Sequence, residues 1–262
     1  MFDWPVYLHG LMGMGIFAVA GWLVSVARKN VTLVDSMWSL FFLLATLIYL
    51  QSVPQVSDRA TLLAALVGIW ALRLSAYLTW RNRLFAKGAA HEDHRYQAIR
   101  KNNEPHFWFK SLYIIFALQA LLAWIISLPL LGAVTSVRAL NWLDAAGFAL
   151  WLLGFLWEAT GDYQLSRFKA NPANKDAVMD KGLWRYSRHP NYFGECCLWW
   201  GYYLIALAAG AWWSLPAPLL MTLLLLKISG VSLLEKDIGE RRPGYNDYIV
   251  RTNALIPGPT KR

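Results

Sequence analysis

Seven long apolar stretches most limit what this chain of 262 residues can fold into. A helix needs about 20 mainly apolar residues to cross roughly 30 Å of hydrocarbon. The stretches lie at about 5–27, 31–53, 60–80, 111–133, 141–160, 197–215 and 216–234. Because backbone groups in lipid must be satisfied within their own segment, such stretches predict helices. We therefore expect an all-α integral membrane protein with seven transmembrane helices.

Seven helices in so short a chain leave no room for a separate soluble domain, and 57% hydrophobic residues is the composition of an integral membrane protein. We expect a single membrane domain over residues 1–262. Its half 1–140 carries few polar residues inside the predicted spans and is expected to face the substrate. Its half 141–262 carries most of the polar side chains and is expected to hold a cofactor. Residues 1–4 lack a basic segment, so no cleavable signal peptide is expected.

Positive charge lies mainly on one side of the predicted membrane. Most of the 25 Lys and Arg residues fall in the loops after the first, third and fifth spans and in the C-terminal tail. The positive-inside rule then places the N-terminus outside and the C-terminus in the cytoplasm. This distribution argues against nucleic acid as the reason for the net charge of +9, and it suits an anionic cofactor.

The densest run of polar side chains is Arg185-Tyr186-Ser187-Arg188-His189-Pro190-Asn191-Tyr192-Phe193-Gly194-Glu195, directly before the sixth predicted span. Polar side chains beside lipid are costly unless they have a function. A loop that only touches anionic headgroups needs Lys and Arg, and it needs no amide, phenol or carboxylate. We therefore interpret the run as part of a binding or catalytic site.

The polar residues around this run suit a nucleotide. Arg and Lys bind phosphates, acids accept from ribose hydroxyls, and the amide of Asn191 can pair with a carboxamide. Glu158 and Asp162 are four residues apart and share a helix face. A salt-bridged cytoplasmic face is the alternative reading. No Gly-x-Gly-x-x-Gly or Walker sequence occurs, which excludes a Rossmann or P-loop site.

The candidate cofactor-binding residues are Asp162, Arg167, Lys169, Lys175, Arg185, Tyr186, Arg188, His189, Asn191, Tyr192, Glu195, Glu235, Arg241 and Tyr245. Their excess of basic residues favours a 2′-phosphate, and therefore NADPH over NADH. Tyr245, Tyr248 and Ile249 have helical spacing, so part of the tail is expected to be a helix along the membrane surface.

Asp35 is the unusual residue of the first half, because it is an acid within the second predicted span. An intramembrane acid is a functional candidate by default. Arg73 in the third span can be its partner, and Tyr77 shares a helix face with Arg73. The alternatives are a catalytic Asp35 assisted by Tyr77 and a structural Asp35–Arg73 pair.

No metal site is expected. The five histidines are too few and too scattered for a di-iron centre, and His91 with His94 supplies only two ligands. Cys196 and Cys197 are adjacent at a span boundary and are expected to pack as small apolar residues.

The run from Arg185 to Glu195 resembles the signature of the steroid 5-alpha-reductase-like membrane proteins. The tail from Leu234 to Pro257, Val34-Asp35-Ser36-Met37-Trp38 and Glu92-Asp93-His94-Arg95-Tyr96 are similar to the bacterial branch of that group. Sterol reductases share the C-terminal half. The resemblance implies localisation in a bacterial inner membrane and a place in lipid or steroid metabolism.

The resemblance further implies a seven-helix reductase that uses NADPH to reduce a double bond conjugated to a ketone. The substrate is then a lipophilic enone from the bilayer, as in a Δ4-3-ketosteroid, with membrane lipids as surroundings. By position, Asp162, Asn191 and Glu195 match residues that hold the cofactor, and Lys169 matches a basic contact. The Gln-Glu pair of the animal enzymes is not present as such; Asp35 with Ser36 is its nearest match, and Tyr77 matches their catalytic tyrosine.

A second family offers an alternative function. Isoprenylcysteine and phospholipid methyltransferases share an Arg-His-Pro-x-Tyr-x-Gly core with residues 188–194 and bind S-adenosylmethionine. Their tail usually shows a Glu-Glu pair, whereas here Glu235 is followed by Lys236. Asn191 and Glu195 favour the reductase.

Overall fold

The computed structural model describes residues 2–85, 92–228, 230, 231, 235, 238, 242 and 244–260. Regular structure within these ranges is helical, and they contain no strand, which confirms the all-α prediction. The chain divides into two compact units. Unit 1 comprises Met1–Leu140 and Ala209–Ala211, and unit 2 comprises Asn141–Ala208 and Trp212–Arg262.

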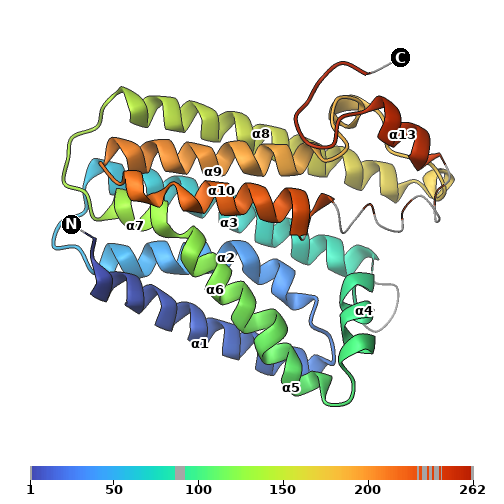
Figure 1. The fold of residues 1–262 in the computed structure, drawn as a ribbon, viewed down its shortest axis with the longest axis horizontal. Helices are drawn as coiled ribbons and strands as arrows, with labels where there is room; N and C mark the ends of the chain where they lie inside the picture. The colour runs from blue at the N-terminus through green and yellow to red at the C-terminus, as the bar shows by residue number, and fades with distance from the viewer. Residues whose placement is uncertain are drawn as a thin grey trace. The chain divides into compact units, whose positions relative to one another are not determined.

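The helices of each unit can be followed by colour in Figure 1. Those of unit 1 are α1 (Trp4–Arg28), α2 (Leu33–Gln51), α3 (Asp58–Phe85), α4 (His94–Asn103), α5 (Phe107–Ser111), the π-helical turn η1 (Leu112–Ala117), α6 (Leu118–Ile126) and α7 (Leu128–Val134). Those of unit 2 are α8 (Trp142–Ala170), the 3-10 turns η2 (Pro172–Asn174), η3 (Gly182–Arg185) and η4 (Trp212–Ser214), α9 (Pro190–Ala208), α10 (Pro216–Leu223), the π-helical turn η5 (Leu224–Ile228) and α13 (Tyr245–Arg251).

Four helical segments are long and apolar enough to cross a membrane: Trp4–Arg28, Leu33–Gln51, Asp58–Asn82 and Phe107–Ile126. They indicate a membrane protein. A shorter apolar segment covers Trp212–Ile228. α8 and α9 have the length of a span, but α8 carries charged residues such as Glu158 and Asp162, and α9 carries Asn191 and Glu195 among its Trp and Tyr residues.

Two helices extend beyond the predicted spans, and one predicted connection contains a helix. α9 begins at Pro190 rather than at 197, because Pro is favoured in the first helical turn while Asn191 and Glu195 make that turn look like a loop. α8 continues to Ala170 rather than ending near 160, and it stops where Asn171 precedes Pro172. The long loop predicted over 81–110 contains α4.

The predicted fourth span is interrupted at Ser127. The backbone N–H of Ser127 bonds the carbonyl oxygens of Ala123 and Trp124, and Pro129 starts the separate helix α7. The Ser127 Oγ lies 2.8 Å from the hydroxyl of Tyr49 in α2, so this buried hydroxyl at the break has a partner within unit 1. Tyr7 of α1 stacks on Trp124 at 4.2 Å between ring centroids, and each donates a hydrogen bond to the other's carbonyl oxygen.

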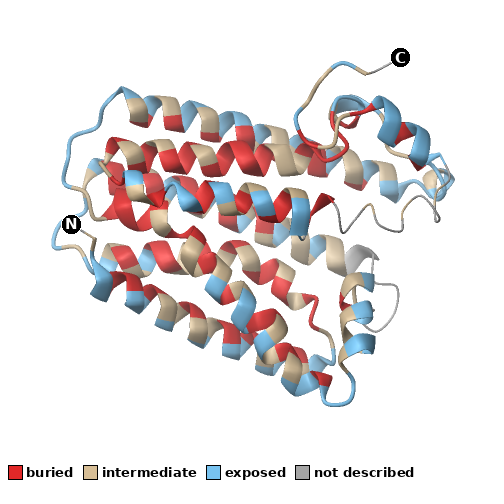
Figure 2. Cartoon of the chain, viewed as in Figure 1, coloured by how far each residue is buried: buried red, intermediate tan, exposed pale blue. Residues whose placement is uncertain are grey.

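Unit 2 is built on a close contact between α8 and α9, which run side by side in Figure 1. Glycines meet at the contact: a Cβ on Gly154 would lie 2.5 Å from the carbonyl oxygen of Gly194. About two helical turns away, a Cβ on Gly147 would lie 2.8 Å from the carbonyl oxygen of Gly201. Small residues allow helix backbones in membranes to approach this closely. Buried positions accordingly run along almost the whole of α9 in Figure 2.

Replacing Gly194 with alanine should therefore destabilise unit 2. The new Cβ would meet the Glu158 backbone nitrogen at 2.5 Å and the Gly154 carbonyl oxygen at 2.6 Å, both backbone atoms that cannot rotate away. We expect a loss of about 1–3 kcal/mol or more in a thermal melt in detergent. The matched control is Gly68→Ala in α3, where a Cβ meets nothing within 4 Å. Equal melting temperatures for both variants would contradict the close contact.

Candidate functional site

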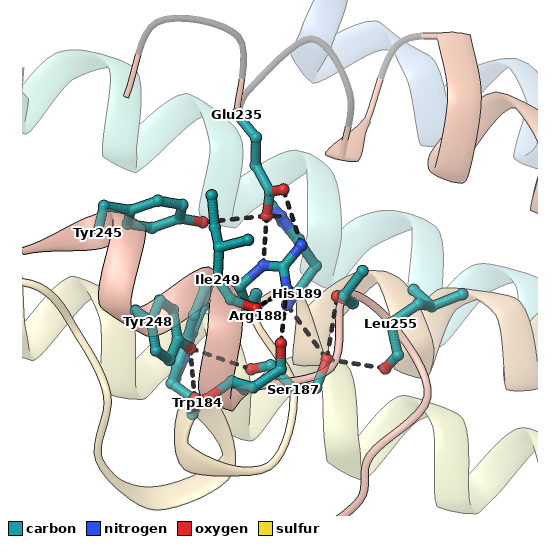
Figure 3. A network of polar contacts seen from close by, with 11 residues as sticks. Trp184, Ser187, Arg188, His189, Glu235, Tyr245, Tyr248, Ile249 and Leu255 are labelled. Carbon is teal, nitrogen blue, oxygen red and sulfur yellow. Dashed lines mark hydrogen bonds and ion pairs between the residues drawn. The ribbon is translucent and has the colours of Figure 1, made fainter. Parts of the chain in front are cut away.

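The polar run predicted as a site connects the start of α9 to the C-terminal tail (Figure 3). The Ser187 hydroxyl donates to the carbonyl oxygen of Leu255 at 2.7 Å, and the backbone nitrogen of Arg188 donates to the carbonyl oxygen of Asn253 at 2.9 Å. The hydroxyl of Tyr248 in α13 donates to the carbonyl oxygen of Trp184. The tail is therefore folded back onto residues 184–188, a contact that no local sequence pattern could predict.

Arg188 is the centre of this network. Its side chain is only 9% exposed, and it forms two parallel bonds with the Glu235 carboxylate, from Nε at 2.7 Å and from Nη2 at 2.9 Å. Its Nη1 donates to the carbonyl oxygens of Ile249 at 3.1 Å and Thr252 at 2.5 Å. The guanidinium thus holds α13 and the residues after it in place.

Glu235 gathers three donors. Besides Arg188, the Nε2 of His189 lies 2.9 Å from Oε1, and since a carboxylate only accepts, this nitrogen carries the hydrogen. The Tyr245 hydroxyl donates to the same oxygen at 3.2 Å. Burial by itself raises the pKa of Glu235, but the hydrogen bonds and charges of His189 and Arg188 outweigh it and lower the pKa to about 2. Glu235 is ionised at neutral pH.

Unit 2 should accordingly lose stability in acid. A carboxyl group whose pKa is lowered on folding stabilises the protein fully above its unfolded pKa, near 4.5, and that contribution disappears as the pH falls toward 2. We expect the melting temperature of the wild type to fall across this window more than that of Glu235→Gln, which cannot ionise. Parallel curves for the two proteins would contradict the assignment.

A second polar cluster lies between α8 and α9. Glu158, Asp162 and Glu195 are all buried, at 2%, 5% and 7% exposure. Asn191 in the first turn of α9 donates from Nδ2 to the Asp162 carboxylate at 3.3 Å. The Oδ1 of Asn191 is buried and accepts no hydrogen bond from the residues that the structure describes. Of the predicted cofactor residues, Asp162 and Glu195 are thus buried in one helix pair, and the half-buried Asn191 is bonded to Asp162.

The other predicted cofactor-binding residues are placed differently. The side chains of Arg167, Lys169, Lys175, Arg185 and Tyr186 are exposed, with the Arg167 Nη1 bonded to the Tyr163 hydroxyl at 3.0 Å. Tyr192 stacks on His189, with ring centroids 5.4 Å apart. Arg241 lies outside the described residues, as does His91. Within the described ranges no group of three or more His, Cys, Asp and Glu residues is placed to hold a metal.

Asp35 lies in the first turn of α2, and its partners come from α4 in unit 1. Arg95 donates from Nη2 to its Oδ2 at 2.7 Å, and the Tyr96 hydroxyl donates to its Oδ1 at 2.5 Å. The partner therefore differs from the predicted Arg73. Arg95 also donates from Nε to Asp93 at 2.9 Å, so the guanidinium bridges two carboxylates.

Tyr96, which the sequence-based prediction did not single out, is the tyrosine that contacts Asp35. It is 7% exposed, and burial followed by the charge of Asp35 holds its pKa well above 10, so the phenol stays protonated. The predicted tyrosine, Tyr77, is half-buried in α3 and lies under the Arg81 guanidinium at 5.9 Å. Tyr96 and Asp35 are about sixty residues apart, and a contact over that distance leaves no local pattern in the sequence. The place of Tyr96 in the Glu92–Tyr96 run was therefore the only sequence signal for it.

Comparisons with known proteins cover the residues described above. A match to the family described as "Protein of unknown function (DUF1295)" covers residues 21–252. The chain is also similar to an uncharacterized protein of Schizosaccharomyces pombe, with 26% identity over 280 residues that take in 96% of this chain and 79% of the relative. No solved structure matches the chain. Asp35, Tyr96, residues 185–195 and Glu235 all lie within the part matched to the family.

Proposed function

The chain belongs to the DUF1295 family, and we propose that it is an NADPH-dependent reductase of a lipophilic enone. The resemblance of residues 185–195 to the steroid 5-alpha-reductase-like proteins suggests this class. The observation that carries the proposal is the set of polar residues Asp162, Asn191 and Glu195 in a helix pair that is otherwise rich in apolar and aromatic residues, with Asp162, Glu195 and the Oδ1 of Asn191 buried.

The residues of this cluster fit a nicotinamide. No described residue donates a hydrogen bond to the buried Oδ1 of Asn191, so this oxygen can accept from the amide N–H of a carboxamide. Asp162 holds the Asn191 amide through Nδ2 at 3.3 Å, and Glu195 lies four residues after Asn191 in α9. NADPH, when bound, supplies a hydride; Asp162, Asn191 and Glu195 bind and orient its nicotinamide end.

The proton chemistry is assigned to unit 1. The phenol of Tyr96 has one hydrogen, which it donates to Asp35 in the free protein; we propose that this hydrogen turns to the carbonyl oxygen of a bound enone as negative charge develops there. Asp35 holds the phenol in place through the 2.5 Å bond until the enone binds, and Arg95 balances the charge of Asp35. This assignment replaces Tyr77 with Tyr96 as the proton donor and gives Asp35 a positioning role.

The finer membrane topology belongs to the same proposal. We infer seven spans, with α8, α9 and the segment Trp212–Ile228 added to the four most apolar helices. The positive-inside distribution then puts the N-terminus outside and the basic loops and tail in the cytoplasm, which for a bacterial cell means the inner membrane. We expect Lys101 in α4 to lie on the cytoplasmic side, which faces the interior of right-side-out vesicles. In Lys101→Cys, the new thiol should therefore react with a membrane-impermeant reagent only after such vesicles are opened.

Ligand-dependent melting tests the cofactor directly. Purified protein in detergent should gain about 2.7 kcal/mol of stability from NADPH at 100 times its dissociation constant. S-adenosylmethionine tests the alternative methyltransferase function in the same assay. A rise with S-adenosylmethionine and none with NADPH would replace the reductase by the methyltransferase.

Asn191→Ala and Glu195→Ala should lose the stabilisation by NADPH while the unliganded proteins still fold. Each variant removes one group assigned to the nicotinamide end, at a cost of about 1–3 kcal/mol for the partner left unsatisfied. The measurement is the NADPH dissociation constant, with Asn253→Ala, a tail amide outside the cluster, as the control. Wild-type affinity in both cluster variants would place the cofactor elsewhere.

A further inference from the structure

A polar pocket of about 460 Å³ lies in unit 2 where the segment before η3 meets the end of α13. Besides Gly182, it is lined by Asp180, Lys181, Arg185, Arg251, Thr252 and Thr260. Three of these residues are cations and one is an acid, so the lining carries a net positive charge. The pocket is distinct from the buried Asp162–Asn191 cluster, and the cation side chains are reached from water.

Two of the cations are available to a ligand. Arg251 is committed in part, because its Nη2 donates to Asp180 at 2.5 Å and so joins the two walls of the pocket. The side chains of Lys181 and Arg185 are exposed and bond to no residue in the part of the chain that the structure describes. A surface that presents unpaired Lys and Arg side chains beside two threonines attracts an anion.

The wall that carries these cations is fixed to α8. The backbone nitrogen of Leu183 donates to Gln164 Oε1 at 2.9 Å, and the indole of Trp184 donates to the carbonyl oxygen of Gly161 at 3.1 Å. Gly182 has φ +60°, and a Cβ there would meet the Gln164 side chain at 2.6 Å, so this turn requires glycine. The two anchor residues of α8, Gly161 and Gln164, lie on either side of Asp162 in the sequence. They connect the pocket wall to the helix that carries the proposed cofactor site.

The chemistry of the lining fits a terminal phosphate. A phosphomonoester carries a charge near −2 and three acceptor oxygens. Arg185 can bind two oxygens in parallel, Lys181 acts as a point charge, and threonine hydroxyls can donate to the third. The Asp180–Arg251 pair leaves the acid neutralised, so it does not repel the anion.

We propose that this pocket binds a terminal phosphate and, resting on the proposed function, that this is the 2′-phosphate of NADPH. Lys181 and Arg185 then distinguish NADPH from NADH, which lacks that phosphate. A lipid phosphomonoester presents the same chemistry, so the test must separate the two sources.

The test is a calorimetric titration of the full chain in detergent with NADPH, NADH, adenosine 2′,5′-bisphosphate and the short-chain lipid dihexanoyl phosphatidic acid. The variant Lys181→Ala/Arg185→Ala should bind NADPH and the bisphosphate about 10- to 100-fold more weakly than the wild type, as expected for lost charge-assisted bonds. Its affinity for NADH should not change. The matched control is Lys101→Ala/Arg28→Ala, which removes the same two charges from exposed positions in unit 1.

The outcomes separate this inference from the proposed function. If the wild type binds NADPH and the double alanine variant binds it equally well, the phosphate assignment is overturned while the reductase stands. If the wild type binds neither dinucleotide, both are overturned. Binding of phosphatidic acid alone, dependent on Lys181 and Arg185, overturns the assignment to the cofactor. The charge-keeping variant Lys181→Arg/Arg185→Lys should retain most of the NADPH affinity, and a loss as large as that of the alanine variant overturns the role of charge.

Discussion

Tyr96→Phe is expected to lower enone turnover by about 10²–10⁴-fold, the range typical of a lost general acid. The phenolic hydroxyl is the only group removed, and Asp35 keeps its ion pair with Arg95 at 2.7 Å, so the fold of unit 1 should survive. Asp35→Asn should lower turnover as well, because a neutral amide holds the phenol less strongly than a carboxylate does. The measurement is single-turnover reduction with saturating NADPH, alongside a melting curve.

The controls separate catalysis from structure. Tyr113→Phe, at an exposed tyrosine of unit 1, should be unchanged in both assays. Tyr77→Phe tests the residue suggested by the family resemblance. If it abolishes turnover while Tyr96→Phe retains it, the proton donor is Tyr77. A reduced melting temperature in Asp35→Asn with normal turnover per folded molecule would make the Asp35–Arg95 pair purely structural.

Arg188→Ala is expected to destabilise the protein by about 3–5 kcal/mol, the range typical of removing one partner of a buried ion pair. The variant removes both bonds to Glu235 and both bonds to the backbone of the tail, at Ile249 and Thr252. Glu235→Gln keeps part of this hydrogen bonding and should cost less. Thermal melts in detergent measure the difference, and limited proteolysis should release the tail after residue 242 in Arg188→Ala.

Arg185→Ala serves as the stability control, since its exposed side chain lies three residues away and outside the network. Its free energy of unfolding should stay within about 0.5 kcal/mol of that of the wild type. The double variant Arg188→Ala/Glu235→Ala measures the coupling between the two side chains. Effects that add without coupling would contradict the bidentate pair.

The sequence by itself determined the helical class and the places of the most apolar helices. Hydrophobic length fixes these, because a segment such as 5–27 can satisfy its backbone in lipid only as a helix. It also singled out residues 185–195, since polar side chains next to an apolar run need a reason. Local signals further explain helix ends, as at α8, where the Asn141 side chain accepts from Leu143 and Asp144 completes a capping box.

Only the tertiary structure decided which polar groups meet. The pairs Asp35–Tyr96 and Arg188–Glu235 join residues about sixty and about fifty positions apart, and charge alone made Arg73 as plausible a partner for Asp35 as Arg95. The start of α9 at Pro190 was hidden for a related reason. Hydropathy reports the average polarity of a window, whereas the first turn of α9 is polar because it packs against Asp162 and Gly161 of α8 rather than against lipid. Side-chain partners depend on how helices pack, and packing is a property of pairs of segments that no single segment encodes.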